Sequence, residues 1–244
     1  MSVRRSTLLS AVGLVSLVSA CASPGAATHS PGSAIAAPSA WPATASPATL
    51  TDPQIEARID TLLAAMTLEE KVGQLIQADI GSIQPADLAR YPIGSILAGG
   101  NSGPGGNDRA PLADWVGLSR AFRDAAASRP GSAIPLMFGI DAVHGHNNIV
   151  GATLFPHNIG LGAARDPELI ERIARATALE VVVSGADWTF GPTLAVPRND
   201  RWGRAYEGYG EDPEIVTSYA GPMTRGLQGE LAAGRPLDAD RIAG

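Results

Sequence analysis

The chain has 244 residues and a formal charge of −6, with 18 Lys and Arg against 24 Asp and Glu. It has no basic stripe of the kind that binds phosphates, so its composition argues against nucleic acid as a partner. Its only cysteine, Cys21, has no second cysteine to pair with. A fold held together by internal disulfides is therefore excluded.

The first 21 residues have the pattern of a bacterial export signal. Arg4 and Arg5 form a basic head, an apolar stretch runs from Leu8 to Val18, and small residues precede Cys21. The apolar stretch is too short to span a hydrocarbon core of roughly 30 Å. Small residues before a lone cysteine resemble a lipobox, so residues 1–21 are predicted to be a signal peptide with Cys21 lipidated. An ordinary signal peptide with an incidental cysteine is the alternative.

This signal predicts a location in the periplasm, or at the outer membrane through a lipid on Cys21. Residues 22–50 are almost entirely Ala, Pro, Ser, Thr and Gly. Such a segment buries too little apolar surface to offset its ordering entropy, so we expect a disordered linker. The folded domain is expected to span residues 51–244.

Within that domain, predicted strands alternate with predicted helices. Apolar runs favour strands at residues 75–79, 93–97, 135–140 and 187–194. Capping residues and helical spacing favour helices at residues 53–66, 67–74, 111–128, 167–184 and 213–227. The alternation predicts an α/β fold with a parallel sheet. A barrel and an open, doubly wound sheet both fit it.

Two polar clusters follow predicted strands. The first spans residues 139–148 and reads GIDAVHGHNN, and the second spans 196–212 and reads VPRNDRWGRAYEGYGED. In a (β/α)₈ barrel, polar residues at the carboxyl ends of the strands converge on the active site. These clusters are therefore the candidate functional residues.

Three motifs, at residues 139–145, 155–162 and 201–212, resemble family 3 glycoside hydrolases in both order and spacing. They are most similar to the branch of β-glucosidases and β-glucan exohydrolases. The resemblance covers the chain from about residue 53 onward. It implies a (β/α)₈-like barrel followed by an α/β sandwich, of which this chain would hold the N-terminal part of the barrel.

The resemblance implies that Asp141 and Arg204 bind sugar hydroxyls in the subsite of the terminal sugar. A carboxylate can accept two hydroxyl hydrogen bonds, and the planar fork of an arginine suits a rigid polyol. The alternatives are a loop-capping role for Asp141 and a salt bridge from Arg204 to Glu207 or Asp212. The expected ligand is a β-glucoside or a β-linked glucose oligosaccharide.

Four further residues are candidates for the surroundings of the sugar. His144 is expected to order the Asp141 loop and Glu207 to orient Arg204, while Trp202 and Tyr206 would either stack on the sugar or pack the barrel rim. His157 is interpreted as a packed loop histidine. His144 and His146 lack a third ligand at a suitable spacing, so neither a metal nor another cofactor is expected.

The family hydrolyses glycosides with retention, which requires a nucleophile and an acid/base about 5 Å apart. The resemblance places both beyond residue 244, so no catalytic residue is assigned and the chain alone is expected to be inactive. Because a truncated barrel exposes an unpaired strand edge, the chain alone is also expected to be poorly soluble or partly molten. Its only lysine, Lys71, is not part of the Lys-His pair that the family carries. The alternatives are a family 3 β-N-acetylglucosaminidase and a lipoprotein that binds oligosaccharide without catalysis.

Overall fold

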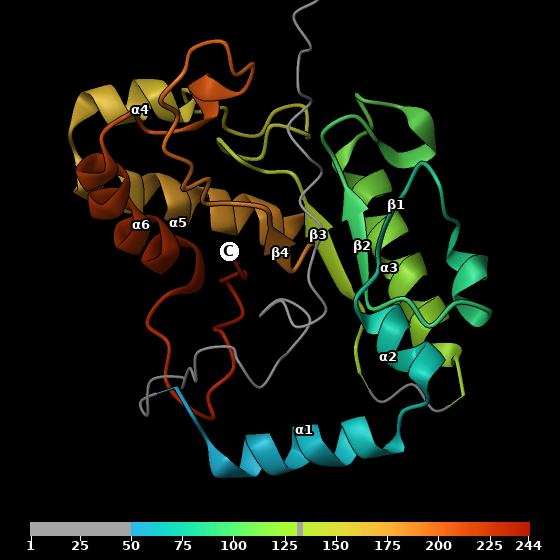
Figure 1. Cartoon of the computed structure of the whole chain (residues 1–244). Helices are drawn as coiled ribbons and strands as arrows, with labels where there is room; N and C mark the ends of the chain where they lie inside the picture. Colours follow the sequence, from blue (N-terminus) through green and yellow to red (C-terminus); the bar gives the residue numbers. More distant parts are fainter. Residues whose placement is uncertain (1–49, 131–133) are drawn as a thin grey trace, which may run out of the picture. The chain divides into compact units, whose positions relative to one another are not determined.

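The computed structural model describes residues 50–130 and 134–244 (Figure 1). The predicted signal peptide, the lipidation at Cys21 and nearly all of the predicted linker lie outside the described residues. Helices and strands alternate along the chain, with short 3₁₀ turns (η) between them. They are α1 (Pro53–Ala65), α2 (Leu68–Gln74), β1 (Gln77–Asp79), η3 (Pro85–Ala89), β2 (Ser95–Ala98), η4 (Pro104–Gly106), α3 (Leu112–Ser128), β3 (Met137–Ile140), α4 (Asn158–Ala164), α5 (Pro167–Val183), β4 (Trp188–Thr189), η5 (Ala205–Glu207) and α6 (Pro213–Gln228).

The four strands form one parallel sheet in the order β1-β2-β3-β4, which confirms the predicted α/β class. Ile96 pairs with Phe138, and Ile140 pairs with Thr189. Beyond β4, Trp188 makes a parallel bridge to Ala243, so pairing continues in chain order. A doubly wound sheet reverses its strand order at a switch point, whereas a barrel adds strands sequentially. The observed order is that of a partial (β/α)₈ barrel.

Four helices begin directly after a polar residue whose side chain caps the first turn. The side chains of Asp52, Asp166 and Asp212 each accept a hydrogen bond from a backbone N–H in the first turn of α1, α5 and α6. Thr67 and Glu70 form a reciprocal capping box at the start of α2. Such caps satisfy donors that would otherwise be unpaired, which is why the helix starts could be located from the sequence.

Strand boundaries differ more from the prediction. β4 has two residues rather than eight, because only the Phe190 N–H continues the ladder to Ile140 before the chain turns away at the Gly191–Pro192 bond. β3 begins at Met137, and this residue is 41% exposed. The continuous apolar run predicts that side chains on both faces of this strand are buried. This prediction holds for Phe138, Gly139 and Ile140 but not for Met137. Helix α4 was not predicted, since Gly160 and Gly162 weaken its pattern.

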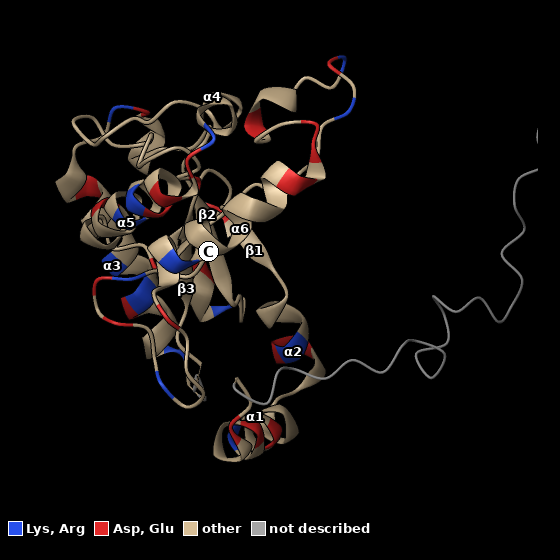
Figure 2. Cartoon of the chain, turned by 90° about the vertical axis from the view of Figure 1, so that its left-hand side faces the viewer, with Lys and Arg blue, Asp and Glu red and all other residues tan. Residues whose placement is uncertain are grey.

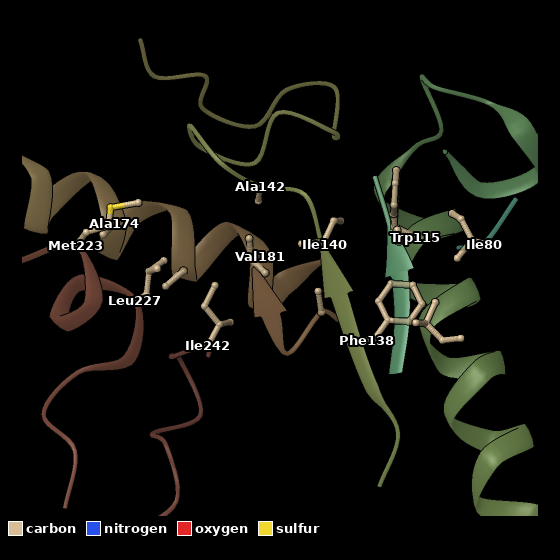
Figure 3. Close-up of a cluster of buried hydrophobic side chains, with 14 of the residues drawn as sticks. Ile80, Trp115, Phe138, Ile140, Ala142, Ala174, Val181, Met223, Leu227 and Ile242 are labelled. Carbon is tan, nitrogen blue, oxygen red and sulfur yellow. The ribbon is translucent and has the colours of Figure 1, made fainter. Parts of the chain in front are cut away.

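The core lies between the sheet and its helices (Figure 3). Phe138 and Ile140 are fully buried on one face of β3, where the Phe138 ring lies 6.2 Å from that of Phe122 in α3. Val181 of α5 and Leu227 of α6 are also fully buried, and Figure 3 shows Ile242 beside them. This packing covers the strands with helices, as a barrel wall requires.

Helix α1 has the predicted periodicity but buries none of its residues. Ile55, Ile59 and Leu63 recur at helical spacing, yet each is between 42% and 45% exposed. Acidic and basic positions are interspersed along the helices rather than segregated by sign (Figure 2). None of the helices in the described ranges has the length and apolar character needed to cross a lipid bilayer.

The close approach of α5 and α6 predicts that Gly226→Ala destabilises the fold. A Cβ at Gly226 would lie 2.4 Å from both the Cβ of Ala174 and the carbonyl oxygen of Glu171, so the helices must separate. Overpacking of this kind costs about 1–3 kcal/mol. Urea unfolding of the variant should show a loss of this size.

Gly117→Ala in α3 is the matched control, because a Cβ there meets nothing within 4 Å. Alanine is favoured over glycine in a helix by roughly 0.5–1 kcal/mol, so this variant should be slightly more stable than the parent. Equal stability of the two variants would contradict the observed packing of α5 on α6.

Candidate functional site

Residues at the carboxyl ends of the strands, and in the loops that follow them, line a cavity of about 530 Å³. All four strands contribute, because Asp79 ends β1 and the other lining segments follow β2, β3 and β4. The lining residues are Asp79, Leu97, Gly99, Gly100, Asn101, Asp141, Val143, His144, Asn147, His157, Phe190, Thr193, Arg204, Tyr206 and Glu207. The parallel sheet thus brings the two predicted clusters together.

Asp141 is a partly buried carboxylate in the wall of this cavity. Its backbone N–H continues the ladder to Ala98, which fixes the residue directly after β3. Within the described residues, no hydrogen bond to either of its carboxylate oxygens occurs, and the Asn148 side chain bonds only its backbone carbonyl. Burial, and next the negative charge of Glu207, raise the pKa of Asp141, while Arg204 and His144 oppose the shift.

The loop after β2 packs tightly against Asp141. Gly100 has φ +64°, and a Cβ at this residue would lie 3.0 Å from the Asp141 Oδ2 atom. Asn148 joins the two loops, since its Oδ1 accepts from the Gly100 N–H and its Nδ2 donates to the Asp141 carbonyl, both at 2.8 Å. These contacts hold the carboxylate in place without using its oxygens.

Arg204 and Glu207, which also line the cavity, form a two-pronged ion pair. The Arg204 Nε and Nη2 atoms donate to the Oε1 and Oε2 atoms of Glu207, each at 2.7 Å. This pair lowers the pKa of Glu207 and raises that of Arg204. Two of the five guanidinium N–H groups are engaged in this way, and the described residues accept no hydrogen bond from the other three. The alternative interpretation of Arg204, a salt bridge to Glu207, is therefore confirmed. The salt bridge does not occupy all of the N–H groups of Arg204.

Aromatic contacts join His144, His157 and Tyr206 along the cavity wall. The ring centroids of His144 and His157 lie 3.9 Å apart and are stacked, and Tyr206 meets His157 edge-on at 4.6 Å. The Nδ1 atom of His144 lies 2.8 Å from the Phe155 carbonyl oxygen, and because a carbonyl only accepts, this nitrogen carries a proton. His157 is a packed loop histidine, as predicted, and it lines the cavity as the residue directly before α4.

Two residues from the polar clusters lie away from the cavity wall. Trp202 is 42% exposed and is not among the lining residues, so the structure does not bring it to the other candidates. His146 is fully buried and its Nε2 bonds the Ser184 hydroxyl at 2.9 Å. No group of three metal-ligating side chains occurs within residues 50–130 and 134–244.

Sequence reasoning missed several residues that shape the cavity. Asp79 lines the cavity and accepts a hydrogen bond from the Ser102 hydroxyl. Its position at the end of the first predicted strand is the sequence signal that could have marked it as a site residue. Asn148 belongs to the first polar cluster, yet the pattern gives it no role. Asn158 donates to the Glu207 carbonyl at 2.8 Å, a contact between residues 49 positions apart that no local pattern reveals.

Comparison with known proteins identifies the family. Residues 67–237 match the model of the glycosyl hydrolase family 3 N-terminal domain. The chain belongs to glycoside hydrolase family 3. The matched range includes all four strands and both polar clusters, so the cavity described above is formed by the family domain.

Family 3 relatives include glycosidases from several kingdoms. The chain is 33% identical over 185 residues to a lysosomal β-glucosidase of Dictyostelium discoideum and 31% identical over 188 residues to a periplasmic β-glucosidase of Salmonella typhimurium. These matches cover 70% and 76% of this chain and 22% of each relative. An exo-1,3/1,4-β-glucanase from a Pseudoalteromonas species is 51% identical with a TM-score of 0.74, covering 80% of this chain and 25% of that one. The chain thus spans about a quarter of the length of these family members.

The buried His146 predicts acid sensitivity of the fold. Its Nε2–H donates to Ser184, whose own hydrogen goes to the Val181 carbonyl at 2.6 Å, and its Nδ1 has no partner in the described residues. Burial lowers the pKa of His146 from 6.5 to about 4. Below pH 6.5 the unfolded chain binds a proton that the folded chain does not, so stability falls as the pH drops toward 4.

At pH 5 this linkage should cost about 2 kcal/mol relative to pH 7. The measurement is urea unfolding at both pH values, with His146→Gln as the control that cannot titrate. The parent should lose more stability than the variant by this amount. An identical pH dependence in the two proteins would refute the assignment to His146.

Proposed function

We propose that this domain forms part of the substrate site of a β-glucosidase or β-glucan exohydrolase, with Asp141 and Arg204 binding hydroxyls of the terminal sugar. The observation that carries the proposal is that Asp141 lines the cavity and that no hydrogen bond to its carboxylate oxygens comes from the described residues. A carboxylate that faces a cavity can accept hydrogen bonds from several hydroxyls of a bound sugar, and such charge-assisted bonds are stronger than neutral ones.

Arg204 supplies hydrogen-bond donors that complement the acceptor oxygens of Asp141 in the same cavity. Arg204 keeps three N–H groups free after pairing with Glu207, so acceptor and donor groups face the same cavity. A sugar hydroxyl donates and accepts at once, and therefore matches such a pair. Tyr206 is 44% exposed beside them and offers an apolar ring to a sugar face.

Relatives support glucose as the sugar. A β-glucosidase from Listeria innocua, 26% identical with a TM-score of 0.56 over 77% of this chain and 26% of its own, was solved in complex with glucose. The curated relatives include β-glucosidases and β-xylosidases. These names favour β-glucoside chemistry over β-N-acetylglucosaminide chemistry for this chain.

Asp141 and Glu207 do not form the catalytic pair in this proposal. A general acid must hold a proton, whereas both Glu207 oxygens accept from Arg204 and its pKa is lowered. Hydrolysis with retention requires a carboxylate nucleophile and an acid/base near the bound sugar. We assign neither role to a residue of this cavity, so we expect the chain alone to bind glucosides without hydrolysing them.

The Asp141→Asn variant tests the sugar-binding role. Replacing one carboxylate oxygen by an amide removes charge-assisted acceptors worth about 1.5–3 kcal/mol, so affinity should fall roughly 10- to 100-fold. NMR titration of the chain with methyl β-D-glucopyranoside measures this. Methyl N-acetyl-β-D-glucosaminide in parallel tests the alternative substrate class.

Asp238→Asn serves as the matched control, because Asp238 forms an exposed ion pair with Arg235 and is not among the cavity-lining residues. The affinity of the Asp238→Asn variant for methyl β-D-glucopyranoside should equal that of the parent chain. Undiminished binding by the Asp141→Asn variant would remove the main support for the proposal, as would preference for the N-acetylated sugar.

We also propose that the protein is exported and lipidated at Cys21, with the periplasmic relative from Salmonella typhimurium as support for export. Labelling with radioactive palmitate in a bacterial host should mark the parent chain and leave a Cys21→Ser variant unlabelled. Export without label in the parent would instead favour an ordinary cleaved signal peptide.

A further inference from the structure

The two proposed sugar-binding residues are carried by loops that do not bond to each other. Asp141 follows β3, and Arg204 lies in the long segment after β4. Within the described residues, no hydrogen bond joins residues 141–148 directly to residues 198–208. Because a sugar must contact both loops at once, their separation has to be set by something else.

The segment 155–158 contacts both loops. On one side, the Phe155 N–H donates to the His144 carbonyl at 3.0 Å, and the His144 Nδ1 donates back to the Phe155 carbonyl at 2.8 Å. On the other side, the Asn158 amide donates to the Glu207 carbonyl. Asn158 is buried at the start of α4, which anchors the segment in the fold.

His157 is the side chain of this segment that contacts both loops through its ring. One face stacks on His144 of the Asp141 loop, and Tyr206 of the Arg204 loop meets it edge-on. The centroid distances of 3.9 and 4.6 Å are those of close aromatic packing. Shortening this side chain would remove both contacts and leave a gap between the loops.

We propose that His157 is a positioning residue that sets the separation of Asp141 from the Arg204–Glu207 pair. The proposal rests on the sugar-binding function proposed above and adds a residue to it. His157 acts by ring packing, so its function requires a flat ring of this size. A ring without nitrogen should therefore replace it.

Charge around the stack is consistent with an uncharged His157. Burial, and next the neighbouring His144, lower the pKa of His157, while Glu207 opposes the shift. Two protonated rings stacked at this distance would repel each other. At neutral pH, packing rather than charge then holds His157 between its neighbours.

The test compares His157→Ala with His157→Phe in the full chain. Titration with methyl β-D-glucopyranoside should show affinity reduced about tenfold by alanine and held within about twofold by phenylalanine. A second readout needs no sugar. The ¹H–¹⁵N signal of Arg204 Nε, set by its bond to Glu207, should move in the alanine variant and stay in the phenylalanine variant.

The outcomes separate this proposal from the function on which it rests. If the parent binds no glucoside, the proposed function fails, and the Arg204 signal alone decides the positioning role. An unmoved signal in His157→Ala, or equal loss in the alanine and phenylalanine variants, would overturn the proposal. Should His157→Ala not fold, Tyr206→Leu removes the second ring contact and must move the same signal.

Discussion

The parallel pairing of β3 with β4 is the constraint on which the site depends. Gly139 pairs with Trp188 and Ile140 with Thr189, and the Thr189 hydroxyl extends the contact to the Ala142 carbonyl at 2.9 Å. Parallel strands end at the same edge of a sheet, so this register brings Asp141 and the segment after β4 to one cavity. At the opposite edge, Asp187 accepts from the Phe138 N–H and pairs with Arg123 of α3.

Electrostatics then differentiates the two carboxylates of the cavity. Glu207 is saturated by Arg204, whereas Asp141 has no hydrogen-bond donor within the described residues. The same negative charge of Glu207 that holds Arg204 also helps raise the pKa of Asp141. One carboxylate thus pairs with a cation, and we propose that the other accepts hydrogen bonds from a ligand. This division is consistent with binding rather than with a pair of catalytic carboxylates.

Local chemistry made much of the fold predictable from the sequence. The caps at Asp52, Thr67 and Asp212 mark the starts of three helices, and apolar runs mark the approximate positions of the four strands. Both signals depend only on residues that are close together in the sequence. Asp141, His144, Arg204, Tyr206 and Glu207, selected from motifs, all line one cavity. The barrel-type strand order could not be chosen from periodicity, because periodicity does not specify which strands become neighbours.

What the sequence could not supply depends on distant contacts. Helix α4 contains Gly160 and Gly162, and glycine disfavours a helix. Its burial through Asn158 and Leu161 depends on contacts with distant parts of the chain. The role of His157 depends on rings at positions 144 and 206, and Trp202, in the same motif as Tyr206, lies outside the cavity lining. Helix α1 has the predicted apolar periodicity but no buried residue, because a periodic apolar stripe does not identify the surface that it packs against.

The most direct test of the central claim is a crystal structure of the chain soaked with glucose. The account predicts a sugar in the cavity, with hydroxyls within hydrogen-bond distance of both Asp141 carboxylate oxygens and the free N–H groups of Arg204, and with the Arg204–Glu207 pair intact. Glucose bound elsewhere, or bound in the cavity without contact to Asp141, would contradict it.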